Sequence, residues 1–442
     1  MKKYLLLTAI LLPLYFWSHA QDFSNKGKDF WVAYGYHAIM NGTNSQDMVL
    51  YFATDQVTNI TITIPGTGYT QTLTSGATPM VLTSAAIPKN GVGDVRLLTE
   101  STTPENKGIH ITADRPIVAY AHIYNANVSG ASILFPTNTL GKEYYSINFD
   151  NVSNTTDANC WFYVIATDTG TTTVEITPSA NTLTHPAGVP FNVTLTQGQV
   201  YNLLGELTSF NNPFTGVDLT GSKIRSISTG TSNCKRIAVF SGSGRISITC
   251  NGNSSSSDNY MVQAFPKSAW GKKYLTAHTG TTTPLSLINN YFRICVSDPA
   301  TVVTVNGAPV TVPLINNFYY QIPATSNPLK IEADQPICVA QYITSQGACS
   351  NGSLGDPEVI YLSPVEQNIS KVIWNATPNF NIQQHYYNVV IPNTGTAISS
   401  FKLDGVAVSP ALFTVHPQDA NFSYLISTVT AGQHRIESDS GF

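Results

Sequence analysis

Residues 109–120 read Ile-His-Ile-Thr-Ala-Asp-Arg-Pro-Ile-Val-Ala-Tyr, and residues 330–341 read Lys-Ile-Glu-Ala-Asp-Gln-Pro-Ile-Cys-Val-Ala-Gln. In both stretches apolar, often β-branched residues alternate with polar ones, and an Asp is followed two positions later by Pro. Such alternation predicts β-strands, and the Asp and Pro predict a turn between two of them. We therefore expect a hairpin that recurs within the chain, and hence a repeated β-rich unit.

Three further patterns recur around this one. A Gly-Lys pair and an aromatic residue open a strand at residues 27–31, 141–145 and 271–275, with a weaker copy at 370–374. A strand that leads to a second, alternating Thr/Val strand lies at residues 49–64, 162–176 and 292–305, and begins again at 387–392. An aromatic or polar residue and a Pro precede each new opening strand, at residues 135–136, 265–266 and 363–364. The chain is therefore expected to consist of four homologous units.

The repeats divide the chain into a signal peptide (1–20), β-repeat 1 (21–137), β-repeat 2 (138–267), β-repeat 3 (268–366) and β-repeat 4 (367–442). A complete repeat holds about seven or eight short strands in roughly 100–130 residues, which predicts an all-β fold of tandem immunoglobulin-like β-sandwiches. The alternative is a β-propeller with two blades per unit, although blades usually repeat at about 40–50 residues. The last unit stops at Phe442, before a second strand of its hairpin, so we expect it to be truncated.

The first twenty residues predict secretion. Lys2 and Lys3 precede an apolar run over residues 4–17, and Ser18-His19-Ala20 offers small residues at a cleavage site, so we expect cleavage after Ala20. No later stretch has membrane-spanning length, so the mature chain should not insert into a membrane. We expect a protein that is secreted or held at the cell surface.

Charged residues make up only 11% of the chain and the formal net charge is −4. The hydrophobic fraction of 42% is large enough for a folded core, and the low, balanced charge argues against nucleic acid as a partner. All six cysteines lie between residues 160 and 349, without zinc-type spacing, so we expect disulfides and no metal. The spacing favours Cys234 with Cys250 and Cys338 with Cys349, which leaves Cys160 and Cys295, but other pairings stay open.

Residues 25–33 (Asn-Lys-Gly-Lys-Asp-Phe-Trp-Val-Ala) and 107–117 (Lys-Gly-Ile-His-Ile-Thr-Ala-Asp-Arg-Pro-Ile) resemble the N-terminal domain of the IgGFc-binding protein family. The resemblance runs from about Gly27 to Phe442. It implies a large extracellular protein, and the short basic signal peptide suits the bacterial, Bacteroidetes-type members. The family offers no catalytic residues to carry over, and immunoglobulin binding by the animal member is not transferred to this chain.

The search for catalytic motifs agrees with that implication. GxSxG, HExxH and a Walker-type loop are absent from the sequence, and we predict no catalytic residue and no cofactor. Asp114 and Asp334 occupy equivalent turn positions; they could ligate calcium, but we expect them to accept hydrogen bonds within their own turns. The 26 acidic residues still allow a carboxylate pair of the kind that glycosidases use.

Aromatic residues are the best candidates for binding. Tyr34 and Tyr36, with Trp31 on the preceding strand, enter a Gly/Asn-rich loop and are predicted to contact a ligand. Tyr386 belongs to a wider set of aromatic candidates, and a core role is expected for most of that set. We predict a non-catalytic binding or adhesion module whose extracellular ligand is a glycan or glycoprotein. The alternatives are a structural stalk that presents a further C-terminal domain and a glycan-active secreted enzyme. An exposed aromatic cluster would favour the binder, and convergent acids in a cleft would favour the enzyme.

Overall fold

The computed structural model describes residues 25–75, 83–125, 127–230, 233–282, 285–353, 355–377, 382 and 384–442. These residues form β-strands and short 3₁₀ turns, which confirms the all-β prediction, and the sheets pair into sandwiches rather than propeller blades. The predicted signal peptide and its cleavage site at Ala20 lie outside the described residues. Within the described part, the chain has no helix of a length and apolarity suited to crossing a membrane.

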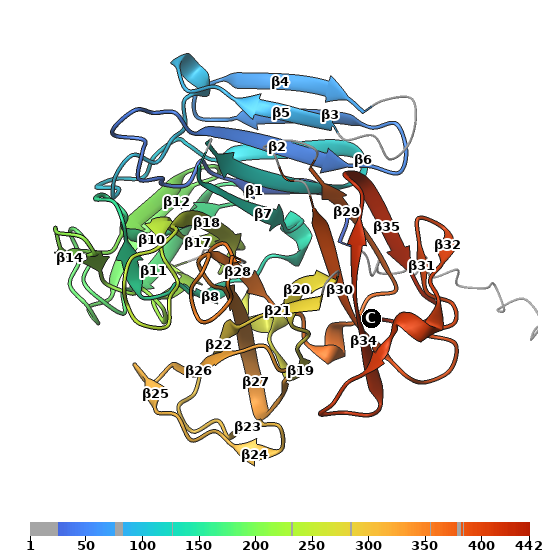
Figure 1. The fold of residues 1–442 in the computed structure, drawn as a ribbon. Helices are drawn as coiled ribbons and strands as arrows, with labels where there is room; N and C mark the ends of the chain where they lie inside the picture. The colour runs from blue at the N-terminus through green and yellow to red at the C-terminus, as the bar shows by residue number, and fades with distance from the viewer. Residues whose placement is uncertain are drawn as a thin grey trace, which may run out of the picture.

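The proposed unit 1 contains seven strands, which Figure 1 shows in blue to teal. They are β1 (Gly27–Val32), β2 (Asp47–Ala53), β3 (Asn59–Ile64), β4 (Tyr69–Thr74), β5 (Thr83–Ile87), β6 (Ile109–Tyr124) and β7 (Ser129–Leu134), with the turn η1 (Gly91–Gly93). The first half of β6 pairs with β1 and β3, and its second half pairs with β2 and β7. One long strand therefore belongs to both layers of the sandwich.

This arrangement corrects the predicted hairpin. The chain does not reverse at Asp114 and Pro116, because β6 runs straight through them and passes from one sheet to the other. The same holds for β27 (Lys330–Ile343), which pairs with β19 and β23 before Pro336 and with β22 and β28 after it. The irregular register between Gly27 and Asp29 lies opposite this corner. Strands commonly change sheets at such bends and bulges.

Unit 2 is a sandwich of two four-stranded sheets, ordered β13-β10-β17-β18 and β12-β11-β16-β8, beside a small sheet β14-β15-β9. Its strands are β8 (Glu143–Tyr145), β9 (Asn151–Ser153), β10 (Cys160–Ala166), β11 (Thr171–Thr177), β12 (Phe191–Thr196), β13 (Val200–Leu204), β14 (Leu207–Ser209), β15 (Phe214–Gly216), β16 (Lys223–Ile227), β17 (Ile237–Ile246) and β18 (Asp258–Gln263), with η2 (Thr137–Thr139) before β8. Here β16 and β17 together correspond to the single long strand of units 1 and 3.

Units 3 and 4 repeat the plan with differences. Unit 3 contains η3 (Lys267–Ala269), β19 (Gly271–Leu275), β20 (Thr279–Thr282), β21 (Leu285–Ile288), β22 (Asn290–Val296), β23 (Val303–Val305), β24 (Ala308–Pro309), β25 (Leu314–Ile315), β26 (Tyr319–Thr325), β27 and β28 (Glu358–Tyr361). Unit 4 contains η4 (Val365–Gln367), β29 (Lys371–Ala376), β30 (His385–Pro392), β31 (Lys402–Leu403), β32 (Val406–Ala407), η5 (Pro410–Leu412), β33 (Thr414–Val415), β34 (Phe422–Val429) and β35 (Gly432–Glu437). Among the described strands, no sheet joins strands of two proposed units.

The repeated Gly and Pro of the sequence meet in space. A Cβ placed on the glycine that opens each of units 1 to 3 would lie 2.2–2.4 Å from the Cβ of the proline that ends the same unit. The pairs are Gly27 with Pro136, Gly141 with Pro266, and Gly271 with Pro364. Only glycine permits this approach, so two motifs that lie roughly 100 residues apart in sequence form one contact that closes each unit.

The units pack in a ring (Figure 1). The inner strands β7, β18 and β28 lie side by side, and Gly130 of β7 allows its backbone to approach Asn259 of β18. Unit 4 returns to unit 1, because Ile373 of β29 packs with Ala53 and Val118. The side-chain amide of Gln433 also bonds the backbone N–H and C=O of Thr54, at 3.0 and 2.8 Å. We call the contact between consecutive units a joint.

Candidate functional site

The predicted binding aromatics are buried. Trp31, Tyr34 and Tyr36 are 1%, 0% and 2% exposed, and they belong to the core that units 1 and 2 share. A Cβ on Gly35 would lie 2.7 Å from the ring of Trp161, so unit 2 covers this loop directly. The prediction that these three residues contact a ligand is therefore wrong, because a segment that looks like a surface loop in sequence is covered by the next unit.

The predicted cysteine pairing is also corrected. Cys250 bonds Cys349, 99 residues further along, and so links unit 2 to unit 3. The predicted pairs Cys234–Cys250 and Cys338–Cys349 are incompatible with this bond, since it uses one cysteine of each. Cys160, Cys234, Cys295 and Cys338 are free thiols, and Cys295 lies directly across from Cys338 on β22 and β27. Packing of the two units, rather than nearness in sequence, decides the bond.

The turn aspartates have structural partners. Asp114 accepts hydrogen bonds from the backbone N–H and side-chain amide of Asn59, both at 2.9 Å. Asp334 accepts one from the backbone N–H of Val302, also at 2.9 Å. Each aspartate therefore ties the bend of a long strand to the start of the Thr/Val region beside it, instead of bonding only its own turn as predicted.

Three equivalent residues form the joints between successive units. Tyr163 on β10, Arg293 on β22 and Asn388 on β30 each lie five residues before an Asp or Asn, on the strand that leads to the Thr/Val strand of the repeat pattern. Each donates a hydrogen bond to a backbone carbonyl of the preceding unit. These bonds are Tyr163 Oη to Ala33 O (3.1 Å), Arg293 Nη1 to Asn148 O (2.9 Å) and Asn388 Nδ2 to His278 O (3.0 Å). One position of the repeat thus performs the same task three times with three different side chains.

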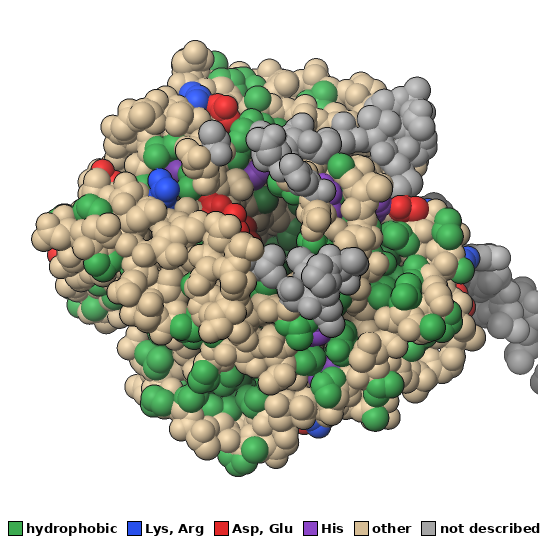
Figure 2. Space-filling model, in the orientation of Figure 1, with side chains coloured by type: hydrophobic (Ala, Val, Ile, Leu, Met, Phe, Trp, Pro, Cys, Tyr) green, Lys and Arg blue, Asp and Glu red, His purple; other side chains and the backbone are tan. Residues whose placement is uncertain are grey.

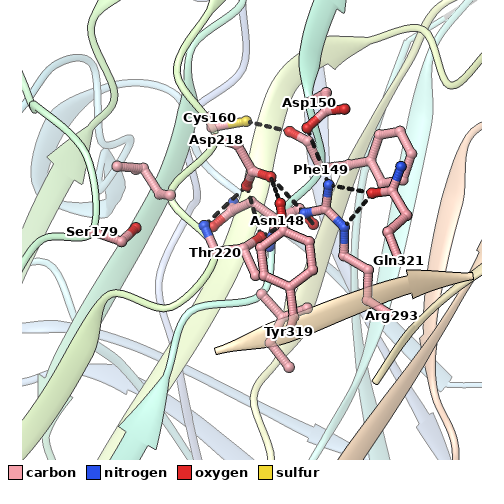
Figure 3. A network of polar contacts seen from close by, with 12 residues as sticks. Asn148, Phe149, Asp150, Cys160, Ser179, Asp218, Thr220, Arg293, Tyr319 and Gln321 are labelled. Carbon is pink, nitrogen blue, oxygen red and sulfur yellow. Dashed lines mark hydrogen bonds and ion pairs between the residues drawn. The ribbon is translucent and has the colours of Figure 1, made fainter. Parts of the chain in front are cut away.

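At the joint between units 2 and 3, Arg293 is fully buried in a polar network (Figure 3). Its guanidinium pairs with Asp218 Oδ2 at 2.5 Å and with Asp150 Oδ1 at 3.1 Å. It also donates to Gln321 Oε1 and Thr220 Oγ1. A buried charge is tolerated only when its donors are satisfied in this way.

Aromatic rings complete that network. The guanidinium carbon of Arg293 lies 4.5 Å from the ring centroid of Phe149 and 4.4 Å from that of Tyr319. Burial alone would lower the pKa of Arg293, but Asp218, Tyr342, Tyr319 and Asp150 together outweigh burial and raise the pKa, so the side chain stays charged. Arg293 itself is enclosed by protein groups, whereas Asp150 also reaches solvent. We therefore assign it to the stability of the joint rather than to ligand binding.

The joint between units 3 and 4 is different, because it contains a cleft of about 880 Å³. One wall is the outer face of β30, with Tyr386, Asn388 and Val390 at alternate positions. The opposite wall combines apolar side chains of unit 3, among them Leu275, Ile343 and Ile360, with a few polar ones. In Figure 2 this face of the molecule is hollowed near its middle, with acidic side chains at the edge of the hollow. The volume and the mixture of apolar walls with few polar groups are typical of ligand sites.

Two carboxyl groups, Asp356 and Glu358, line the unit 3 side of the cleft, and Asp258 of β18 lies near them. Burial raises the pKa of Glu358 to about 8. Burial also raises the pKa of Asp258 and that of Asp356, and for Asp258 the neighbouring Asp356 adds to the effect. At neutral pH Asp258 and Glu358 therefore tend to carry protons and can donate as well as accept hydrogen bonds. Within the described residues, no group of three or more His, Cys, Asp or Glu side chains has a metal-binding arrangement.

Sequence reasoning missed this site. Tyr386, one of a wider set of aromatic candidates for most of which a core role was expected, is 36% exposed and lines the cleft. One signal in the sequence could have indicated it. The equivalent positions Tyr163, Arg293 and Asn388 differ in side-chain length, and the shortest side chain, Asn388, lies at the joint that contains the cleft. The sequence allowed a carboxylate pair of the glycosidase type. It did not show which of the 26 acidic residues would lie close together.

Fold and site together define a repetitive all-β protein that offers a preformed cleft with carboxyl groups on one side. A family model described as IgGFc binding protein matches residues 130–442. Because the match covers more than half of the chain, the protein belongs to this family, which is a family of binding modules and not of enzymes. None of the curated proteins matches the chain. The stretches 25–33 and 107–117, which carried the resemblance in sequence, precede the matched residues.

Proposed function

We propose that the chain is an extracellular binding module of a bacterium, secreted or held at the cell surface, and that it takes up a glycoprotein ligand in the cleft between units 3 and 4. The observation that carries the proposal is the cleft itself, with its apolar walls and the exposed ring of Tyr386. Aromatic faces stack on sugar rings and on other flat groups, and Asn388, Asp356 and Glu358 offer hydrogen bonds to hydroxyl and amide groups.

Binding of the purified chain to immobilised mucin, immunoglobulin Fc and a set of serum glycoproteins tests the proposal. Each glycoprotein is measured before and after enzymatic removal of its glycans, which separates recognition of sugar from recognition of polypeptide. Tyr386→Ala removes the ring from the cleft. Phe210→Ala is the matched control, because Phe210 is 68% exposed and lies outside the cleft.

We expect saturable binding that Tyr386→Ala weakens at least about tenfold, equivalent to about 1.4 kcal/mol, and that Phe210→Ala leaves unchanged. Binding that survives Tyr386→Ala and a second cleft variant, Ile360→Asp, would place the ligand elsewhere and refute the cleft as its site. Absence of binding to every glycoprotein would refute the binding role and favour the structural stalk.

A further inference from the structure

Two of the four free thiols face each other across a sheet. Cys295 on β22 and Cys338 on β27 are opposite one another in the antiparallel register of these strands. Residues opposite each other in such a pair place their side chains on the same face of the sheet. Both thiols accordingly lie in the core that units 2 and 3 share. The other free thiols have different surroundings, since Cys160 is opposite Ser243 of β17 and Cys234 lies in the loop before β17.

The neighbouring backbone hydrogen bonds show which kind of opposite pair the two cysteines form. The N–H of Val296 donates to the C=O of Phe318 at 2.7 Å, on the β26 side of β22. The C=O of Val339 accepts from the N–H of Leu362 at 2.9 Å, on the β28 side of β27. Successive residues of a strand point their backbone groups to opposite edges, so those of the two cysteines point at each other. The cysteines are therefore a hydrogen-bonded pair of the ladder.

A pair of this kind brings the two sulfurs within reach of a covalent bond. Its Cα atoms lie about 5.5 Å apart, inside the range of about 4.4–6.8 Å that disulfides span. Its Cβ atoms are separated by up to about 5.5 Å, against a mean of about 3.8 Å in disulfides. A small local shift of the two strands must therefore accompany bond formation, and the bond is strained and more easily reduced than a relaxed one.

We infer that Cys295 and Cys338 form a second disulfide in the exported protein, which links β22 to β27 beside the joint with unit 2. The inference rests on the extracellular location in the proposed function, since disulfides persist in oxidising compartments. The two linked strands carry Arg293 and Tyr342, whose side chains both donate a hydrogen bond to Asn148 O of unit 2, at 2.9 and 2.7 Å. The bond thus holds together the two donors that attach unit 3 to unit 2.

The oxidant is a small-molecule or protein disulfide of the compartment into which the chain is exported. The thiolate of one cysteine attacks this disulfide, forms a mixed disulfide and releases one thiolate of the oxidant. The thiolate of the second cysteine then attacks the mixed disulfide, closes the Sγ–Sγ bond and releases the other thiolate. The cysteines together lose an electron pair and both thiol protons, and the oxidant takes these up to become a pair of thiols.

The exchange belongs to folding rather than to the finished core. Burial raises the pKa of both thiols, that of Cys338 to about 12, and the neighbouring Cys338 adds to the rise for Cys295. Thiolate is the attacking species, and the folded core contains little of it at neutral pH. The bond therefore closes before unit 3 is fully packed and is afterwards shielded from further exchange.

Thiol counting after refolding tests the inference. The chain is unfolded, reduced and refolded in glutathione buffers of increasing oxidised content. Free thiols are then labelled with a maleimide under denaturing conditions, and peptide mass spectrometry shows which cysteines carry the label. The bond between Cys250 and Cys349 is the internal control, because it is present in the structure. Cys160→Ser and Cys295→Ser are matched variants, since each removes a buried free thiol.

We expect the oxidised chain to carry label on Cys160 and Cys234 alone, whereas all four free thiols are labelled if the facing pair stays reduced. In Cys295→Ser, Cys338 loses its partner and should become labelled, whereas Cys160→Ser should leave the facing pair unlabelled. Formation of the second disulfide should require a buffer at least about tenfold more oxidising than the bond between units 2 and 3, because it is strained. The same labelling pattern is expected for chain recovered from the periplasm of a bacterial expression host.

Label on both Cys295 and Cys338, in buffers up to pure oxidised glutathione that form the bond between Cys250 and Cys349, would overturn the inference. A bond from either of the facing cysteines to Cys160 would overturn it as well. Both outcomes are read from the parent chain, so they do not depend on the folding of a variant. Because the assay uses no ligand, reduced facing thiols beside intact glycoprotein binding would overturn the disulfide and leave the proposed function standing. A closed disulfide in a chain that binds no glycoprotein would support the disulfide alone.

Discussion

The joints on either side of unit 3 are built on the same plan, but one is closely packed and the other contains a cleft. Between units 2 and 3, the joint position holds Arg293, which is enclosed by carboxylates and rings, and a disulfide joins the two units. Between units 3 and 4, the same position holds Asn388, and a cleft of about 880 Å³ remains beside it. A repeat can therefore seal one joint and open the next without a change of fold.

Removal of the charge from the closed joint should have the largest effect. Arg293→Met leaves Asp218 buried without its partner, and breaking a buried pair in this way costs about 3–5 kcal/mol in the free energy of unfolding. The measurement is urea unfolding. Lys273→Met is the matched change at the open joint, where Lys273 pairs with Asp419 at 2.7 Å, and it should cost only about 1 kcal/mol because the lysine is partly exposed. Equal losses at the two joints would contradict the comparison.

The disulfide should have the next largest effect. Replacing Cys250 and Cys349 together by Ser removes a cross-link that closes a loop of about 100 residues, which should lower the free energy of unfolding by about 3 kcal/mol. Thermal unfolding of the oxidised protein measures the loss. Cys234→Ser, which touches only a free thiol, should change stability by less than about 0.5 kcal/mol. A double variant as stable as the parent would show that unit 3 is held to unit 2 by packing alone.

The acids beside the cleft should have a smaller, pH-dependent effect. The folded state raises the pKa of Glu358 from its usual 4.5 to about 8, so the unfolded chain loses the proton first. Stability therefore falls as pH rises from about 5 to 8 and is retained below that window. Glu358→Gln keeps an oxygen that accepts the Val359 N–H and should stabilise the protein by about 2 kcal/mol at pH 8.

Melting temperatures between pH 5 and pH 8 measure this effect. Glu332→Gln, at a partly exposed position of β27, is the control and should leave the pH profile unchanged. We expect the melting temperature of Glu358→Gln to fall less steeply with rising pH than that of the parent. Equal slopes for the two proteins would refute the assigned role of Glu358.

Much of the fold could be predicted from local pattern. The alternation along residues 109–120 and 330–341 indicated strands correctly, because a pleated strand places successive side chains on opposite faces. The same pattern could not show that Asp114 and Pro116 mark a bend within one strand instead of a reversal. Both geometries use the same residues locally, and only the pairing of β6 with four other strands distinguishes them.

The candidate site could not be predicted in this way. Tyr34 and Tyr36 lie in a loop-like sequence, and their burial depends on Trp161 of the next unit. Tyr386 resembles its buried counterparts in sequence, and its exposure depends on the space left between two units. The burial of a side chain at a joint depends on both of the surfaces that pack there. The sequence of one surface alone therefore does not predict it.

The sequence by itself determined that this chain is all-β and repetitive, because strand alternation is a local pattern and the same motifs recur along the chain. The tertiary structure alone decided which units touch, that Cys250 meets Cys349, and that one joint is closed by Arg293 while the next holds a cleft. The reason is physical: local conformation follows from neighbouring residues, whereas burial, cross-linking and cavities arise from contacts between segments roughly 100 residues apart.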